Sequence, residues 1–185
     1  FPDNGGFLYP TLYIVEAYAE FFAFASLIDP DESARPQHAQ RARRLLMYAM
    51  DHAKQGLASG QPFRDPLFST YDRANAWGEA WGLVVDWLQA SNTLTAQDLA
   101  DIRSVFLTWA EIQMTAYNHP EPVGVTNSPA LLTNGTTHRA AMNNYYAGHM
   151  RLLTMTALSF DAAHDPPVDP AKPAMLRGNT LRSYI

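Results

Sequence analysis

The chain has 185 residues, 47% of them apolar, which is enough for one globular domain with a real core and too little for two. Its 18 acidic and 13 basic side chains give a net charge of −5, and this argues against a general nucleic-acid binder, because neutralising phosphates takes clustered lysines and arginines. There is no cysteine, so disulfides and thiolate metal sites are excluded and the compartment is left open.

The first predicted helix covers residues 12–28 and ends before Pro30. It is the most apolar stretch of the chain, but Glu16 and Glu20 interrupt it. A charge inside a membrane-spanning helix is costly. We therefore expect a buried helix of a globular domain and no membrane span.

A second helix is predicted at residues 35–57, with a row of alanines and leucines facing inward. It carries the one basic cluster of the chain, Arg41, Arg43 and Arg44. The simplest interpretation of this cluster is a solvated helix face.

The third and fourth helices are predicted at residues 77–90 and 95–117. Gly78 and Gly82 stand beside tryptophans and indicate tight packing of the third helix, and Thr95 is a good N-cap for the fourth. Because the connection between them is so short, the two helices should be antiparallel neighbours.

A long connection rich in Pro, Thr and Asn follows at 119–138, and connections of this length are usually functional or disordered. The fifth helix carries an apolar stripe at steps of three and four: Met142, Tyr146, Met150, Leu153, Ala157 and Phe160. Beside it runs a second row: Tyr145, His149, Leu152 and Thr156. A sixth helix could begin within 175–185.

Strand signals are almost absent, so the predicted class is all-α: one domain over residues 1–185, made of tandem antiparallel helical hairpins that form an α/α toroid or part of a longer one. If consecutive helices alternate up and down, the short connections (29–34, 91–94) lie at one end and the long ones (58–75, 118–140) at the other. The Arg-Ala pairs at Arg73 and Arg139 stand 66 residues apart before two such helices and suggest stacked hairpins.

The fifth helix opens on Asn143 and Asn144, which is a poor start for a core helix because neighbouring Asn side chains compete with the backbone for hydrogen bonds. This start, the Asp-Trp-Leu segment at 86–88 and the Leu-Thr pair at 94–95 resemble the α/α-toroid domain of alginate lyases and heparinase II/III-like polysaccharide lyases. The resemblance spans about residues 70–165. It implies β-elimination on an acidic polysaccharide or oligosaccharide, without a cofactor, in a secreted or periplasmic protein.

In such a lyase, amide, Arg or His donors neutralise the uronate carboxylate, a base takes the adjacent proton, and an acid protonates the leaving oxygen. The resemblance implies these catalytic candidates: Asn143 or Asn144 as neutraliser, Tyr145 or Tyr146 as acid, His149 or His138 as base, and Arg139 as helper.

This chain departs from the lyase pattern, in which His directly follows the Asn pair and Tyr145 stands here instead. His149 comes five residues after Asn144 and so faces about 140° away from it on a helix. Either His138 replaces it, or a tyrosine makes both proton transfers, or the protein is not catalytic.

The same catalytic candidates have alternative roles that are purely structural. His149 and the two tyrosines can be core residues with satisfied polar atoms, and the Asn pair can cap the helix. The candidates for sugar binding are Tyr71, Arg73, Asn75, Trp77 and Trp81. For Trp77 and Trp81, core packing is the alternative to a sugar-stacking platform.

Two other functions compete with the lyase. The segment Arg73-Ala-Asn-Ala-Trp77 resembles the Arg-Gly-Asn-Gly-Trp stretch of unsaturated glucuronyl hydrolases, and hydrolysis would need paired carboxylates. The acids available for it are Asp65, Asp72 and Glu79. A non-catalytic carbohydrate-binding or surface-interaction domain is the third hypothesis. Whichever function holds, a short open array of five or six helices could be closed by self-association. The His spacing gives no support for a metal site, because no predicted helix has two His four residues apart.

Overall fold

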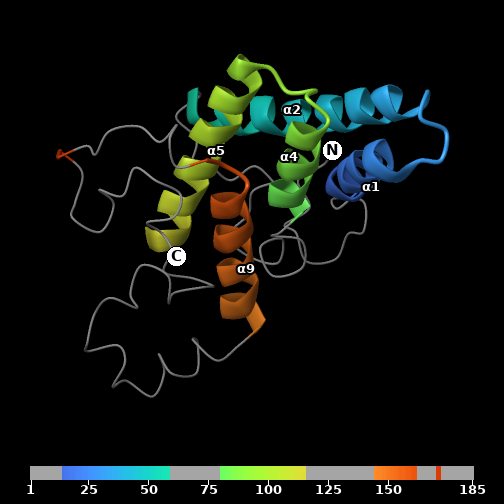
Figure 1. The fold of residues 1–185 in the computed structure, drawn as a ribbon. Coiled ribbons are helices and arrows are strands. Elements are labelled where there is room, and N and C mark those ends of the chain that lie inside the picture. The colour runs from blue at the N-terminus through green and yellow to red at the C-terminus, as the bar shows by residue number, and fades with distance from the viewer. Residues whose placement is uncertain (1–13, 59–79, 116–143, 162–169, 172–185) are drawn as a thin grey trace.

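The computed structural model describes residues 14–58, 80–115, 144–161 and 170–171, and this part of the chain contains five α-helices and no β-strand (Figure 1). The helices are α1 (Ile14–Ile28), α2 (Arg35–Ala58), α4 (Ala80–Ala90), α5 (Ala96–Thr115) and α9 (Asn144–Leu158). The all-α class is confirmed for the described residues. The sixth helix predicted within 175–185 lies outside them, as do residues 77–79 of the predicted third helix.

α1 and α2 form a hairpin whose facing surfaces consist largely of alanine. Ala19 and Ala23 of α1 are fully buried. On α2 the buried positions recur at steps of three and four: Ala39, Ala42, Leu46, Ala49 and Ala53. Methyl side chains allow two helix backbones to come close together, and α1 and α2 share the most extensive contact of any two described helices.

The turn between α1 and α2 is held by Asp29. Its carboxylate accepts a hydrogen bond from the Asp31 backbone N–H at 2.9 Å and lies 2.9 Å from His38 Nε2. Arg35 Nε donates to the Asp29 backbone carbonyl at 2.8 Å. These bonds use both the main chain and the side chain of Asp29. They follow directly after Ile28, the last residue of α1, so the predicted end of the first helix is confirmed.

α4 ends in a Schellman motif. The backbone N–H of Thr93 donates to the Leu88 carbonyl at 3.2 Å, and that of Asn92 donates to the Gln89 carbonyl at 3.0 Å. Asn92 has φ 52°, the left-handed conformation that this motif requires and that Asn tolerates better than most residues. The chain therefore reverses direction within a few residues.

α5 begins with reciprocal capping between Thr95 and Asp98. Thr95 Oγ1 accepts from the Asp98 backbone N–H at 3.1 Å, and the Asp98 carboxylate accepts from the Thr95 backbone N–H at 2.8 Å. The predicted N-cap is confirmed. The same carboxylate also receives Arg43 of α2 through Nε at 2.8 Å and Nη2 at 2.9 Å, so one buried side chain fixes both a helix start and a helix pair.

The interpretation of the basic cluster on α2 as a solvated face is wrong for Arg43, because this guanidinium is paired with Asp98. Arg41 lies over the Phe22 ring, 5.4 Å from its centroid, and Arg44 makes a long local hydrogen bond to the Gln40 carbonyl. Spacing along one helix could not reveal these partners, because Asp98 and Phe22 belong to other helices.

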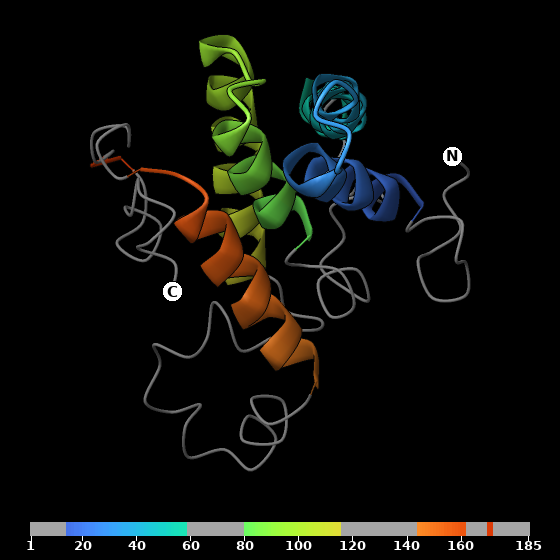
Figure 2. The same cartoon turned by 45° about the vertical axis from the view of Figure 1, so that its right-hand side comes forward.

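The α1–α2 hairpin lies across the other three helices. In Figure 1 α2 runs across the view while α4, α5 and α9 run up and down it, and Figure 2 looks nearly along α2. The described helices therefore do not all alternate up and down, which is the condition for placing the short connections together. The connections at 29–34 and 91–94 do not lie at a common end (Figure 1).

α4 and α5 run in opposite directions, as the short connection predicts (Figure 1). The helices that approach α4 most closely are nevertheless α1 and α9. The buried face of α5 carries Phe106 and Trp109, and α5 packs mainly on α2 and α9. On α4, Gly82 lets the backbone of α9 come close instead, which confirms the tight packing expected at this glycine.

All five helices contribute to one continuous core. Its largest fully buried side chains are Trp81, Trp109, Phe106, Leu46, Met50, Leu88, Ile102, Leu152 and Leu153. Among the described residues, no helix is both long enough and apolar enough to cross a membrane.

Candidate functional site

Four of the predicted catalytic residues lie in the first two turns of α9. This helix begins at Asn144, so the backbones of Asn144, Tyr145, Tyr146 and His149 are described, whereas their side chains are not. The remaining predicted site residues, apart from Trp81, lie outside the described part of the chain: Asn143, His138, Arg139, Tyr71, Arg73, Asn75 and Trp77.

The first turns of α9 project beyond the described part of α4. The two helices meet where Gly82 faces Met155. Asn144 precedes Met155 by eleven residues, which corresponds to about 16 Å along a helix axis. Ala80, where α4 begins, is only two residues from Gly82. Figures 1 and 2 both show α9 extending past α4 at this end. Among the described helices, α4 therefore does not flank the helix start.

The row that contains Tyr145 and His149 faces the core where its side chains are described. Leu152 and Thr156, the next members of the row, are both 1% exposed. The Thr156 hydroxyl donates to the backbone carbonyl of Leu152 at 2.9 Å, which satisfies it within the helix. The apolar stripe is buried as well, since Leu153 and Ala157 belong to the same core.

Trp81 is completely buried, with an exposed fraction of 0%. It is one of the largest core side chains, and a sugar ring cannot stack on a surface that solvent does not reach. The predicted role of Trp81 in substrate binding is therefore corrected to core packing, the alternative that its helical spacing had left open.

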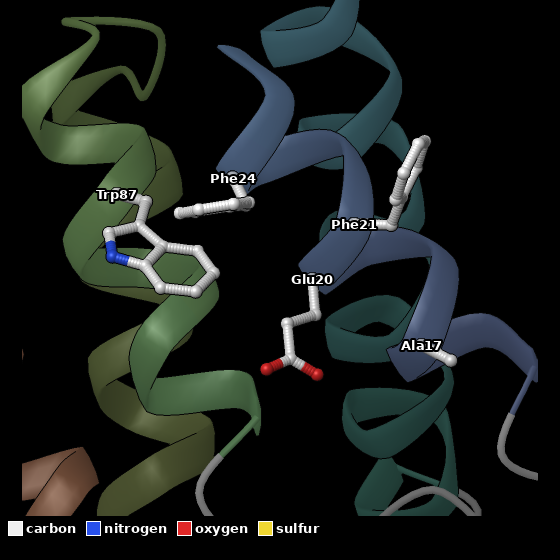
Figure 3. Close-up of a pocket in the computed structure, with 5 residues that line it drawn as sticks. All are labelled: Ala17, Glu20, Phe21, Phe24 and Trp87. Carbon is white, nitrogen blue, oxygen red and sulfur yellow. The ribbon is translucent and has the colours of Figure 1, made fainter. Parts of the chain in front are cut away.

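An aromatic pocket of about 310 Å³ lies between α1 and α4 (Figure 3). We call it the α1–α4 pocket, and its lining residues are Ala17, Glu20, Phe21, Phe24 and Trp87. Figure 3 shows the Phe24 ring, the Trp87 indole and the Glu20 carboxylate between the two helices, whereas Phe21 extends from α1 away from α4. The pocket thus combines two aromatic rings with one carboxylate.

The two rings of the α1–α4 pocket are held at an angle to each other. The centroids of Phe24 and Trp87 are 5.3 Å apart and their planes are inclined by 46°. Trp87 is partly buried against the core, and Phe24 is 45% exposed. One ring is therefore anchored while the other borders on solvent.

The sequence indicates the α1 side of the α1–α4 pocket but not the α4 side. Ala17, Glu20 and Phe24 follow one another at steps of three and four, so they share a face of α1. The partner ring, Trp87, lies on another helix more than sixty positions away, and only the crossing of α1 over α4 brings it near.

A second pocket, of about 520 Å³, lies near the end of α9 and involves Gln89, Leu99, Arg103 and Phe160. Gln89 Nε2 donates to the Ser159 carbonyl at 2.6 Å, and Arg103 Cζ lies 4.6 Å from the centroid of the Phe160 ring. These polar groups hold the end of α9 in place, which gives them a structural role.

Within the described residues, no group of three or more His, Asp or Glu side chains is arranged to hold a metal ion. Comparisons of the chain with protein-family models, with curated protein sequences and with solved structures give no significant match. What the protein does must therefore be argued from its own residues.

Proposed function

We propose that the chain is a carbohydrate-active domain, part of an α/α toroid, that cleaves uronic-acid-containing polysaccharides by β-elimination. The observation that carries the proposal is the start of α9: among the described helices, α9 begins at Asn144 and its first turns extend past α4 (Figure 1). The first backbone N–H groups of a helix lack partners within it, and they favour negative charge. This is a suitable place for a uronate carboxylate.

The proposed roles follow from the chemistry of the reaction. The proton next to a uronate carboxylate becomes removable once amide donors neutralise that carboxylate, here Asn143 or Asn144. A base then takes the proton, and a tyrosine protonates the leaving glycosidic oxygen. The glycosidic C–O bond breaks as a double bond forms between its ring carbon and the carbon that lost the proton.

The test is incubation of the purified chain with alginate, pectate and glycosaminoglycans while the ultraviolet absorbance of the unsaturated uronate is recorded. A lyase raises the absorbance in proportion to enzyme concentration. A hydrolase instead releases reducing ends without this absorbance. Sugar binding with neither signal would support a non-catalytic carbohydrate-binding domain and would end the lyase proposal.

A further inference from the structure

We propose that the α1–α4 pocket binds a small quaternary ammonium compound, at a site separate from the proposed polysaccharide site. The pocket offers aromatic ring surfaces and a carboxylate in a volume of about 310 Å³, at the small end of ligand pockets. Glu20 would repel the uronate carboxylates of an acidic polysaccharide, so this pocket suits a ligand of the opposite charge.

The α1–α4 pocket contains two kinds of group that attract positive charge, aromatic rings and a carboxylate. The faces of aromatic rings are electron-rich, and Phe24 and Trp87 stand 5.3 Å apart at an inclination of 46°, so that a rounded cation can touch both. The Glu20 carboxylate lies in the same space between the helices (Figure 3). The protein already places cations on rings elsewhere, since Arg41 lies over Phe22.

The α1–α4 pocket suits a quaternary ammonium better than a primary one, because it offers few hydrogen-bond acceptors. A primary ammonium has three N–H donors, and the side chains that line the pocket provide one carboxylate as their only strong acceptor. A quaternary ammonium has no donor to satisfy and needs only apolar contact and negative charge. Glu20 also has an interaction within the protein. A carboxylate has about four lone-pair sites, and its charge acts at a distance on a ligand that takes none of them.

The experiment is a proton NMR titration of choline with the full chain, followed at the trimethylammonium signal. Its uncharged carbon isostere, 3,3-dimethylbutan-1-ol, and the primary amine ethanolamine are titrated in the same way. We expect choline to bind in the millimolar range with an upfield shift from the ring faces, and both comparison compounds to bind at least about tenfold more weakly.

Two variants place the site. Glu20→Gln keeps the shape of the side chain and should weaken choline binding about tenfold, whereas Glu32→Gln removes the same charge from the exposed turn outside the pocket and should not. Phe24→Ala should reduce the upfield shift, because only the Trp87 ring then remains beside the ligand, whereas Tyr18→Ala, also exposed on α1 but not part of the lining, should keep it.

The proposal is overturned if choline does not bind, if the isostere binds as tightly as choline, or if Glu20→Gln leaves the affinity unchanged while far-ultraviolet circular dichroism shows a folded protein. None of these results depends on polysaccharide cleavage, so the choline titration and the lyase assay test the two proposals independently.

Discussion

Gly82 of α4 lies directly against the backbone of Met155 in α9. A Cβ atom added at Gly82 would be 2.7 Å from both the carbonyl carbon and the carbonyl oxygen of Met155. These are main-chain atoms inside a helix and cannot move aside as a flexible side chain can. The contact therefore limits how closely α9 and α4 can pack.

We predict that Gly82→Ala lowers the stability of the protein. Alanine favours a helix over glycine by up to about 1 kcal/mol, but an overpacked core costs about 1–3 kcal/mol, and the displaced atoms here are backbone. Urea unfolding followed by circular dichroism measures the difference, and Gly82→Ser should be less stable still. A Gly82→Ala protein at least as stable as the wild type would show that α9 does not pack this closely.

Asp98 should make the stability of the fold depend on pH. Burial is the largest single influence on its pKa and raises it, but the hydrogen bonds from Arg43 and Thr95 together outweigh burial and hold the pKa below its ordinary value of 3.8. A carboxylate with a lowered folded pKa stabilises the protein above its unfolded pKa. This stabilisation is lost as the pH falls from about 4 through the lowered folded pKa.

We therefore predict that Asp98→Asn costs about 1–3 kcal/mol at neutral pH, and that the difference from the wild type shrinks below pH 4. Thermal unfolding across a pH series measures both effects. The matched control is Asp101→Asn, which removes the more exposed pair with Lys54 between the same two helices and should cost less than about 1 kcal/mol. Equal costs for the two variants would contradict the special role of Asp98.

The burial of Trp81 gives a prediction about stability rather than binding. Trp81→Ala should cost about 3–5 kcal/mol, because it empties the centre of the core, whereas Trp81→Phe should cost much less. Unfolding curves provide the measurement. A Trp81→Ala protein with an unchanged melting temperature and weakened polysaccharide binding would instead support a sugar-stacking platform.

The helices and their caps could be predicted from the sequence because their signals are local. Pro30 marked the end of α1, and Thr95 with Asp98 in the first turn marked the start of α5. The crossing of α1 over α4 could not be predicted, because it depends on which helix faces fit together. The meeting of Phe24 with Trp87 follows from that crossing, and the pairing of Arg43 with Asp98 follows from the packing of α2 on α5, which the sequence does not reveal either.

The candidate site could be predicted only as a set of residue types at a helix start. The row of Tyr145, His149, Leu152 and Thr156 follows steps of three and four throughout, and such spacing does not say which members face the core. Leu152 and Thr156 turn out to be buried. The function of the polar half of the row therefore has to be tested by substitution.

Asn144→Ala separates a catalytic role from a capping role. If Asn144 neutralises the uronate carboxylate, the variant should lose turnover in the ultraviolet assay while losing at most about 1 kcal/mol of stability, the usual cost of removing a cap.

Asn92 provides a matched control, since it has a structural role at φ 52° in the turn after α4. Asn92→Ala should cost about 1–2 kcal/mol and leave turnover per folded molecule unchanged, because only the left-handed backbone is disturbed. If Asn144→Ala behaves like Asn92→Ala, less stable but fully active, Asn144 is a cap and the carboxylate must be neutralised elsewhere.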